Sequence, residues 1–173
     1  MTPSEVLDTL LKSYRRYYNI KRDDVEPPFA AEAVFHSHDE QYFLVRSAKL
    51  AEAEAHEYVF FAVCDLLDLP LAQELDRIAW ERGVSRARPG PNHRSTDVTL
   101  VILSEHIAPE AKRYIQQLKR YQSYRFTLHG WSHYRAIAME TSTGILSCNR
   151  RGRDLKKLFG NIHSSKERQG ESK

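Results

Sequence analysis

Several features that define whole classes of protein are scarce in this sequence of 173 residues. The only cysteines, Cys64 and Cys148, lie in apolar stretches without a second residue at metal-ligand spacing, so we expect two small buried thiols. The seven glycines are scattered, and the lack of a glycine-rich loop excludes nucleotide hydrolysis of the P-loop kind. No long apolar run opens the chain, which argues against a secretory signal and a spanning helix. We therefore expect a cytoplasmic protein without membrane contact.

The composition that remains is that of a globular domain. Apolar residues make up 41% and charged residues 28% of the chain, close to the averages for soluble proteins. The length suits one domain that needs no metal or disulfide to stabilise its core. We expect a single domain over residues 1–163 and a disordered polar tail over residues 164–173.

Capping residues and apolar periodicity predict the helices. Thr2-Pro3-Ser4-Glu5 has the form of a capping box, and it predicts a first helix that continues to about residue 18. A second helix follows Asp65 or Asp68 and is expected to stop at Gly83, before a long loop. A third helix opens at Pro109, and a short basic helix is expected over residues 153–159.

Runs of β-branched and aromatic residues predict the strands. We expect them at residues 31–37, 41–47, 57–63, 97–103, 124–129, 133–140 and 144–149, with a loop over residues 19–30. Strands 57–63 and 97–103 are apolar on both faces, and the helix between them favours a parallel crossover. The prediction is a three-layer α/β domain, on the border of α+β, with a mixed sheet flanked by helices in the order αβββαβαβββα.

The opening αβββαβ resembles the core order of the restriction-endonuclease-like fold. That resemblance implies metal-dependent cleavage through carboxylates, for which Glu32, Asp39 and Glu57 are the candidates. The pattern is incomplete, because Val59 stands where that family has a lysine, and Lys49 would have to enter the site from the next segment. A divergent nuclease therefore remains an alternative, against surface carboxylates at strand ends.

Two histidine-containing motifs are candidates for other chemistry. His36-Ser37-His38-Asp39 could begin a metal site with Glu57, because residues two apart on a strand share a side, but no recognisable ligands follow. An exposed polar hairpin is the simpler interpretation. His129-Gly130-Trp131-Ser132-His133 places a hydroxyl beside imidazoles, yet it lacks the Gly-x-Ser-x-Gly elbow and an acid partner. We interpret Gly130 as a bend between strands, and we predict no catalytic residue, metal or cofactor.

Basic and aromatic residues gather in the C-terminal third of the chain. Arginines neutralise phosphates and exposed aromatic rings stack on bases, so the cluster predicts a surface for nucleic acid or a phosphorylated ligand. A solvated basic helix beside packed aromatics is the alternative. The candidate contact residues are His129, Trp131, His133, Tyr134, Arg135, Arg150, Arg151, Arg153, Lys156 and Lys157.

Four segments, YRRYYNI, EYVFF, DVTLVIL and YRFTLHGWSHYRAIAME, resemble a family of small bacterial proteins, mainly from Firmicutes, classed as a domain of unknown function. The resemblance covers nearly the whole chain and implies no activity. We therefore expect a non-enzymatic intracellular binding domain, with the nuclease as its alternative. A homodimer through a strand edge is also compatible with the sequence.

Overall fold

The computed structural model describes residues 1–36, 54–160 and 162. Its helices are α1 (Pro3–Tyr14), α2 (Leu69–Ser85) and α3 (Pro109–Gln117), and the 3-10 helix η2 (Arg151–Leu155) continues as helix to residue 160. Its strands are β1 (Asn19–Lys21), β2 (Ala31–His36), β3 (Glu54–Leu67), β4 (His93–Ile107), β5 (Tyr121–Ser123), β6 (Trp131–Glu140) and β7 (Ile145–Cys148). The predicted strand at 41–47 lies outside the described residues.

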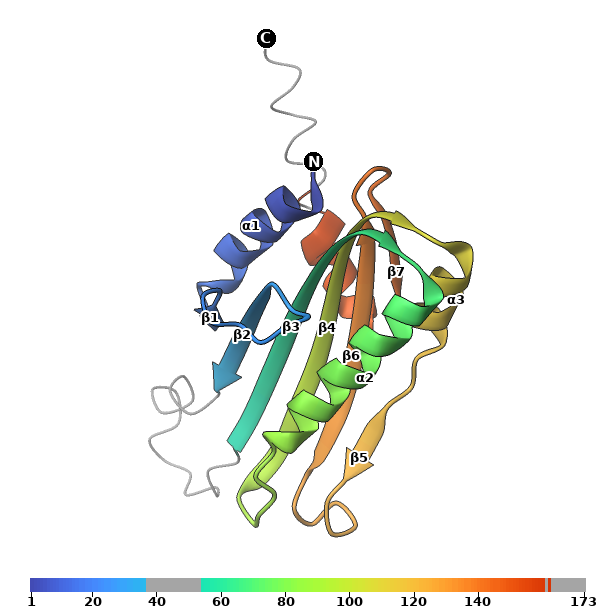
Figure 1. The fold of residues 1–173 in the computed structure, drawn as a ribbon. Coiled ribbons are helices and arrows are strands. Elements are labelled where there is room, and N and C mark those ends of the chain that lie inside the picture. Colours follow the sequence, from blue (N-terminus) through green and yellow to red (C-terminus); the bar gives the residue numbers. More distant parts are fainter. Residues whose placement is uncertain (37–53, 161, 163–173) are drawn as a thin grey trace.

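All seven strands belong to one mixed sheet, which confirms the predicted α/β class (Figure 1). The strand order is β1-β2-β3-β4-β6-β5, and β7 pairs with β6 as well. Strands β3, β4 and β6 are parallel, whereas β1, β2, β5 and β7 run antiparallel to their neighbours. The crossover from β3 through α2 to β4 is the predicted one. Each face of the sheet is packed against helices, which gives three layers.

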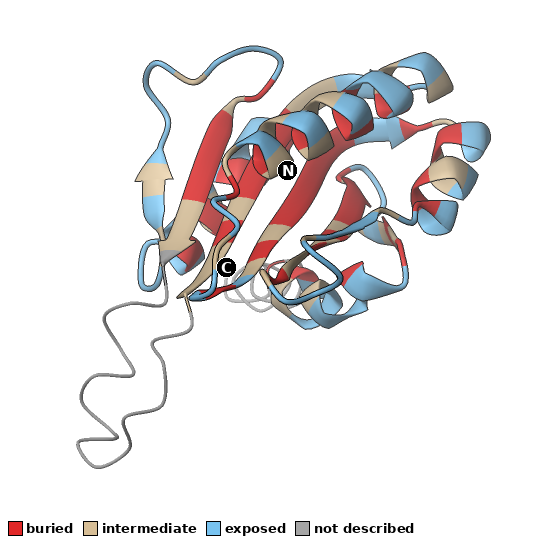
Figure 2. Ribbon diagram, turned by 90° about the horizontal axis from the view of Figure 1, so that it is seen from below, coloured by how far each residue is buried: buried red, intermediate tan, exposed pale blue. Residues whose placement is uncertain are grey.

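One face of the sheet packs against α2 and α3. Alternate residues of the central strands point to it, among them Phe60, Leu100 and Tyr134, and all three are buried there beside Leu75 of α2. In Figure 1 α2 runs along this face in front of β3, β4 and β6. Figure 2 shows buried residues concentrated on the central strands and exposed residues on the outer sides of the helices.

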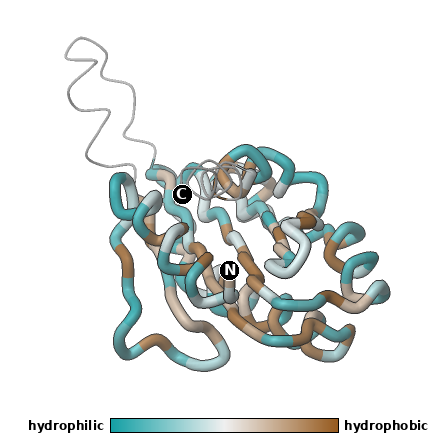
Figure 3. The backbone as a smooth tube through the Cα atoms, turned by 90° about the horizontal axis from the view of Figure 1, so that it is seen from above, coloured by the Kyte–Doolittle hydropathy of each residue, from teal (hydrophilic) through white to brown (hydrophobic). Residues whose placement is uncertain are grey.

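The opposite face packs against α1 and the C-terminal helical segment. Leu7 and Leu10 of α1 and Phe159 are buried against Phe61 of β3 and Val101 of β4. In Figure 1 α1 and η2 lie near the end of the sheet where β3 terminates. Figure 3 shows hydrophobic and hydrophilic segments interspersed along the backbone. The apolar contacts of α1 are therefore confined to one half of this face.

The predicted starts of α1 and α2 are confirmed, but the predicted stop at Gly83 is not. The capping box is formed, because Thr2 accepts a hydrogen bond from the Glu5 backbone and the Glu5 side chain accepts one in return. Asp68 caps α2, but Gly83 does not end it. A Cβ at Gly83 would lie 2.3 Å from Cγ2 of Val98, so this glycine permits close packing of α2 on β4.

Three further boundary predictions are wrong. The first helix ends at Tyr14, and β1 occupies part of the loop expected over residues 19–30. The strand expected at 124–129 is a turn in which Arg125, Phe126 and Thr127 all have positive φ, and the strand lies just before it as β5. Short apolar runs do not distinguish a strand from a tight turn by periodicity alone. The cysteines are free as expected but only half-buried.

Among the described residues, no helix is both long enough and apolar enough to span a membrane.

Candidate functional site

Polar side chains occupy the half of the α1-side sheet face that α1 does not cover. Because residues alternate between faces, the apolar positions that pack on α1 continue into polar positions at the other end of the same strands. On β3 the change comes at Glu57, and on β6 it comes at Arg135. The polar residues of this half are Glu57 on β3, Asp97 and Thr99 on β4, and His133 and Arg135 on β6.

Glu57 is the best-satisfied carboxylate of this half. Its Oε2 accepts a hydrogen bond of 2.6 Å from the Tyr18 hydroxyl, and its Oε1 accepts one of 2.8 Å from Thr99. Nη2 of Arg135 lies 3.0 Å from the same Oε1. Burial, and then the charge of Glu57, raise the pKa of Tyr18, so its hydroxyl remains a donor. With three donors, Glu57 is held in place and its charge is offset.

Asp97 lies next to this network and also faces Arg135. Its Oδ1 accepts a hydrogen bond of 3.3 Å from the His133 backbone, and its Oδ2 lies 3.8 Å from Nη2 of Arg135. Burial raises the pKa of Asp97, although Arg135 and the backbone hydrogen bond act in the opposite direction. Arg135 thus lies between two carboxylates and is not a free cation.

His133 lies near two other rings on the same face. The centroid of its ring is 5.2 Å from that of Tyr121 and 6.2 Å from that of Trp131, and we call these three residues the aromatic row. Tyr121 is 55% exposed, and the other two are half-buried. Burial, and then the charge of Arg151, lower the pKa of His133, so the imidazole is neutral at pH 7. The row therefore presents an uncharged aromatic surface.

A group of cations, which we call the basic turn, lies beside β6. It comprises five exposed residues at the start of the C-terminal helical segment, and none of them forms an ion pair with another described residue. Arg151 is near enough to His133 to lower its pKa. The members of the basic turn are Arg150, Arg151, Arg153, Lys156 and Lys157.

Asn149 fixes the basic turn to the sheet. Its Oδ1 accepts hydrogen bonds from the backbones of Ala136 and Gly152, and its Nδ2 donates to the carbonyls of Tyr134 and Leu118. Gly152 is required for this approach, because a Cβ there would lie 2.5 Å from the carbonyl oxygen of Ala136. Asn149 is 2% exposed with both ends of its amide bonded, so the turn is held rigidly at β6.

The structure does not bring every sequence-predicted residue to this surface. Tyr134 is 1% exposed and packs against Trp80 on the α2 side, so its expected ligand contact is wrong. His129 lies in the turn before β6, where its carbonyl accepts a hydrogen bond of 2.6 Å from Nδ1 of His93. Ser132 is buried and bonds to the Tyr124 hydroxyl, so it does not join His133 as the adjacent sequence positions suggested.

The carboxylates considered for metal chemistry are also separated. Glu32 forms an ion pair of 2.8 Å with Arg86 at the end of α2, and Glu57 lies on the opposite face of the sheet. Asp39, His38, Lys49 and the side chain of His36 lie outside the described residues. Within the part of the chain that the structure describes, no group of three potential ligands is positioned to hold a metal ion.

Sequence reasoning missed Tyr18, Asp97, Thr99 and Asn149. For two of them a signal was present, because Asp97 and Thr99 are alternate polar positions in a strand interpreted as apolar on both faces. Such an alternation indicates a face that changes from packed to polar along its length. Asn149 had no comparable signal, since three of its four partners lie in β6 and at Leu118, which are distant in the sequence.

Comparison with known proteins adds a family but no activity. A family described as Domain of unknown function (DUF8052) matches residues 2–161. No curated protein and no solved structure matches the chain.

Proposed function

The chain belongs to the family described as Domain of unknown function (DUF8052), and we propose that it is a non-enzymatic intracellular binding domain for an anionic ligand. The contact surface is formed by the basic turn and the aromatic row. One observation carries the proposal: the five exposed cations of the basic turn form no ion pair with another described residue, and one of them, Arg151, lies near His133 of the aromatic row.

The electrostatic argument rests on the contrast between Arg135 and Arg151. The charge of Arg135 is offset by Glu57 and Asp97, so this residue holds the network in place and adds little affinity for an anion. Arg151 has no such partner among the described residues, and an arginine in this state can pair with both oxygens of a phosphate. Anion binding would therefore centre on the basic turn and extend over His133.

The alternative, a divergent metal-dependent nuclease, has less support. It requires carboxylates that can share a cation, but Glu32 and Glu57 lie on opposite faces. The oxygens of Glu57 are engaged by Tyr18, Thr99 and Arg135, whose guanidinium already supplies a positive charge. Asp39, the third candidate, lies outside the described residues. Calorimetric titration with Mn²⁺ tests this alternative directly, and heat of binding abolished by Glu57→Gln would favour it.

Charge reversal in the basic turn tests the proposal. We expect the wild-type domain to bind a fluorescein-labelled single-stranded oligonucleotide, or its abasic analogue, at low salt. Arg151→Glu with Arg153→Glu should weaken binding at least tenfold and reduce the slope of log K against log salt by about 1.4, because each lost phosphate contact removes about 0.7. Fluorescence anisotropy over a salt series measures both quantities.

The matched control reverses two exposed cations elsewhere, Arg113→Glu on α3 and Lys119→Glu just after it. Both double variants carry the same net charge, so a difference between them reports position and not overall charge. If wild-type protein binds neither strand at low salt, or if the two variants lose equal affinity, the proposal is wrong.

A further inference from the structure

We infer that the ligand of this surface is a single-stranded nucleic acid whose bases stack on Tyr121 and Trp131 while its phosphates contact the basic turn. The inference rests on the proposed function, because it specifies which anion the surface accepts. It adds the aromatic residues of the β5–β6 hairpin, which an anion bound through its charge alone would not need to contact.

The spacing and exposure of the aromatic row support stacking. Tyr121 lies across from His133 on β5 and Trp131 lies two residues before it on β6, with centroid distances of 5.2 and 6.2 Å and tilted planes, so the rings adjoin without forming a closed stack. Tyr121 is 55% exposed on β5, which is the last strand at its edge of the sheet in the part of the chain that the structure describes. Aromatic side chains of this kind stack on unpaired bases, whereas the base faces of a duplex are covered by their neighbours.

The charges of the same face favour one placement of the strand. Asp97 repels phosphates, and the charge of Arg135 beside it is already offset by carboxylates. The phosphate backbone of a bound nucleic acid is therefore excluded from this part of the sheet. The unpaired charge lies in the basic turn, near His133 through Arg151. Bases over the uncharged row and phosphates toward the basic turn satisfy both constraints. A free phosphate or a phosphopeptide would use only the second half of this arrangement.

The hairpin that carries the row is fixed before any ligand arrives. Arg120, immediately before β5, donates two hydrogen bonds of 2.8 Å to the buried Asp76. At the other end of β5, the Tyr124 ring lies 5.6 Å from that of His93, which also bonds the carbonyl of His129. Rings on anchored backbone lose less entropy when they bind, which increases the affinity of a stacking surface.

The experiment compares a dodecathymidylate strand, a dodecauridylate strand and an abasic deoxyribose-phosphate strand of equal length. In a Trp80→Phe background, Trp131 is the only tryptophan, and its fluorescence should be quenched by the strands with bases but not by the abasic strand. Tyr121→Leu and Trp131→Leu should each weaken binding of dodecathymidylate roughly tenfold and leave the abasic strand unaffected.

Matched variants separate stacking from loss of structure. Tyr121→Phe retains the ring and should retain binding, and Tyr17→Leu removes a tyrosine of similar exposure, 52%, from the α1–β1 connection without effect. Circular dichroism checks that each variant is folded. Equal affinity for the abasic strand, or equal or tighter binding of a twelve-base-pair duplex, would overturn the inference while anion binding stands. No binding of any strand would instead reject the proposed function itself.

Discussion

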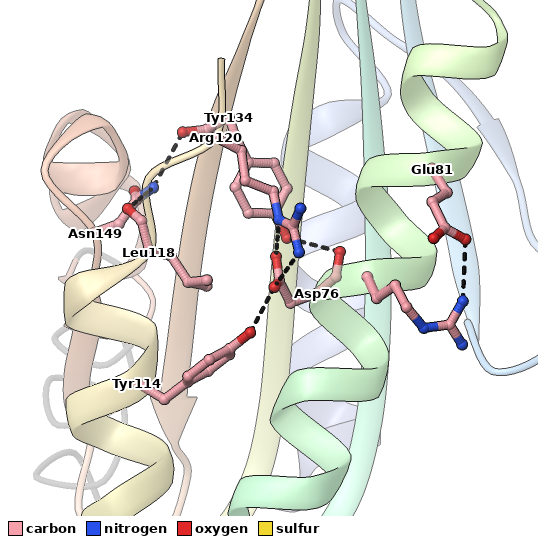
Figure 4. Close-up of polar contacts among 8 residues, drawn as sticks. Asp76, Glu81, Tyr114, Leu118, Arg120, Tyr134 and Asn149 are labelled. Atoms are coloured by element: carbon pink, nitrogen blue, oxygen red, sulfur yellow. Dashed lines mark hydrogen bonds and ion pairs between the residues drawn. The ribbon is translucent and has the colours of Figure 1, made fainter. Parts of the chain in front are cut away.

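Removing the charge of Arg120 should reveal how the domain anchors the strand that carries Tyr121. Nε and Nη2 of Arg120 each donate a 2.8 Å hydrogen bond to the Asp76 carboxylate, and Tyr114 donates a third of 2.7 Å (Figure 4). Asp76 is fully buried in α2, and the Arg120 side chain is 31% exposed. The variant Arg120→Met keeps the length of the side chain but leaves the carboxylate with one hydroxyl donor.

The magnitude follows from the unpaired charge. Breaking a buried ion pair by removing one partner costs about 3 to 5 kcal/mol, and the partial exposure of Arg120 places this variant near about 3 kcal/mol. Burial and the hydrogen bond to Asp76 raise the pKa of Tyr114 to about 12, so its hydroxyl donates throughout the neutral range but cannot neutralise the carboxylate. The double variant Asp76→Leu with Arg120→Met removes both charges and should lose less stability than Arg120→Met alone.

Urea unfolding followed by tryptophan fluorescence measures the effect, because Trp80 packs 5.5 Å from Tyr134 close to this network. We expect a lower midpoint for Arg120→Met at unchanged slope, and partial recovery in the double variant. A loss below about 1 kcal/mol would mean that Asp76 finds water or another donor, since that is the range of an exposed pair. A double variant less stable than the single one would also refute the reasoning.

Two further predictions concern packing and pH. Gly83→Ala should destabilise the domain by about 1 to 3 kcal/mol, because the stiff, fully buried Val98 cannot move away from a Cβ at 2.3 Å. The control Gly90→Ala places its Cβ in open space and should not change the thermal unfolding temperature. The variant Asp97→Asn should be more stable than wild type at pH 7. Burial raises the pKa of Asp97 in the folded state above its ordinary value of 3.8, so the wild type loses stability as the pH rises from 3.8 through the folded-state pKa. Unfolding of both proteins from pH 3 to pH 7 measures this gap, and a gap that narrows with rising pH contradicts it.

Local chemistry was sufficient to predict much of the fold. The capping box at Thr2, the cap at Asp68 and the proline at the start of α3 are short-range signals, and each marks an observed helix start. The apolar runs of β3 and β4 likewise predicted the parallel centre of the sheet. Gly83 shows the limit, because a glycine near a helix end has the same sequence signature whether it ends the helix or admits a neighbouring strand.

The candidate site was predictable only in part, because its geometry depends on contacts between distant segments. Trp131, His133 and Arg151 were identified from their residue types, and the structure places them on one side of the sheet. The pairing of Arg135 with Glu57 requires the register of three strands, which no local pattern encodes. Tyr134 was misassigned for a different reason: a residue between two surface positions of a strand faces the opposite side, and this alternation could have been read from the sequence.

The polar half of the α1-side face is difficult to explain by stability alone. A buried ion pair adds little stability compared with apolar side chains of similar volume. Yet Glu57, Thr99 and Arg135 are each followed, two residues along the same strand face, by the apolar residues Val59, Val101 and Ile137. Departures from the simplest packing of this kind concentrate where a protein contacts its ligand. The network fixes Arg135, offsets its charge and leaves Arg151 as the available cation. In the proposed function, the buried pair would set where an anion can bind and the basic turn would supply the affinity.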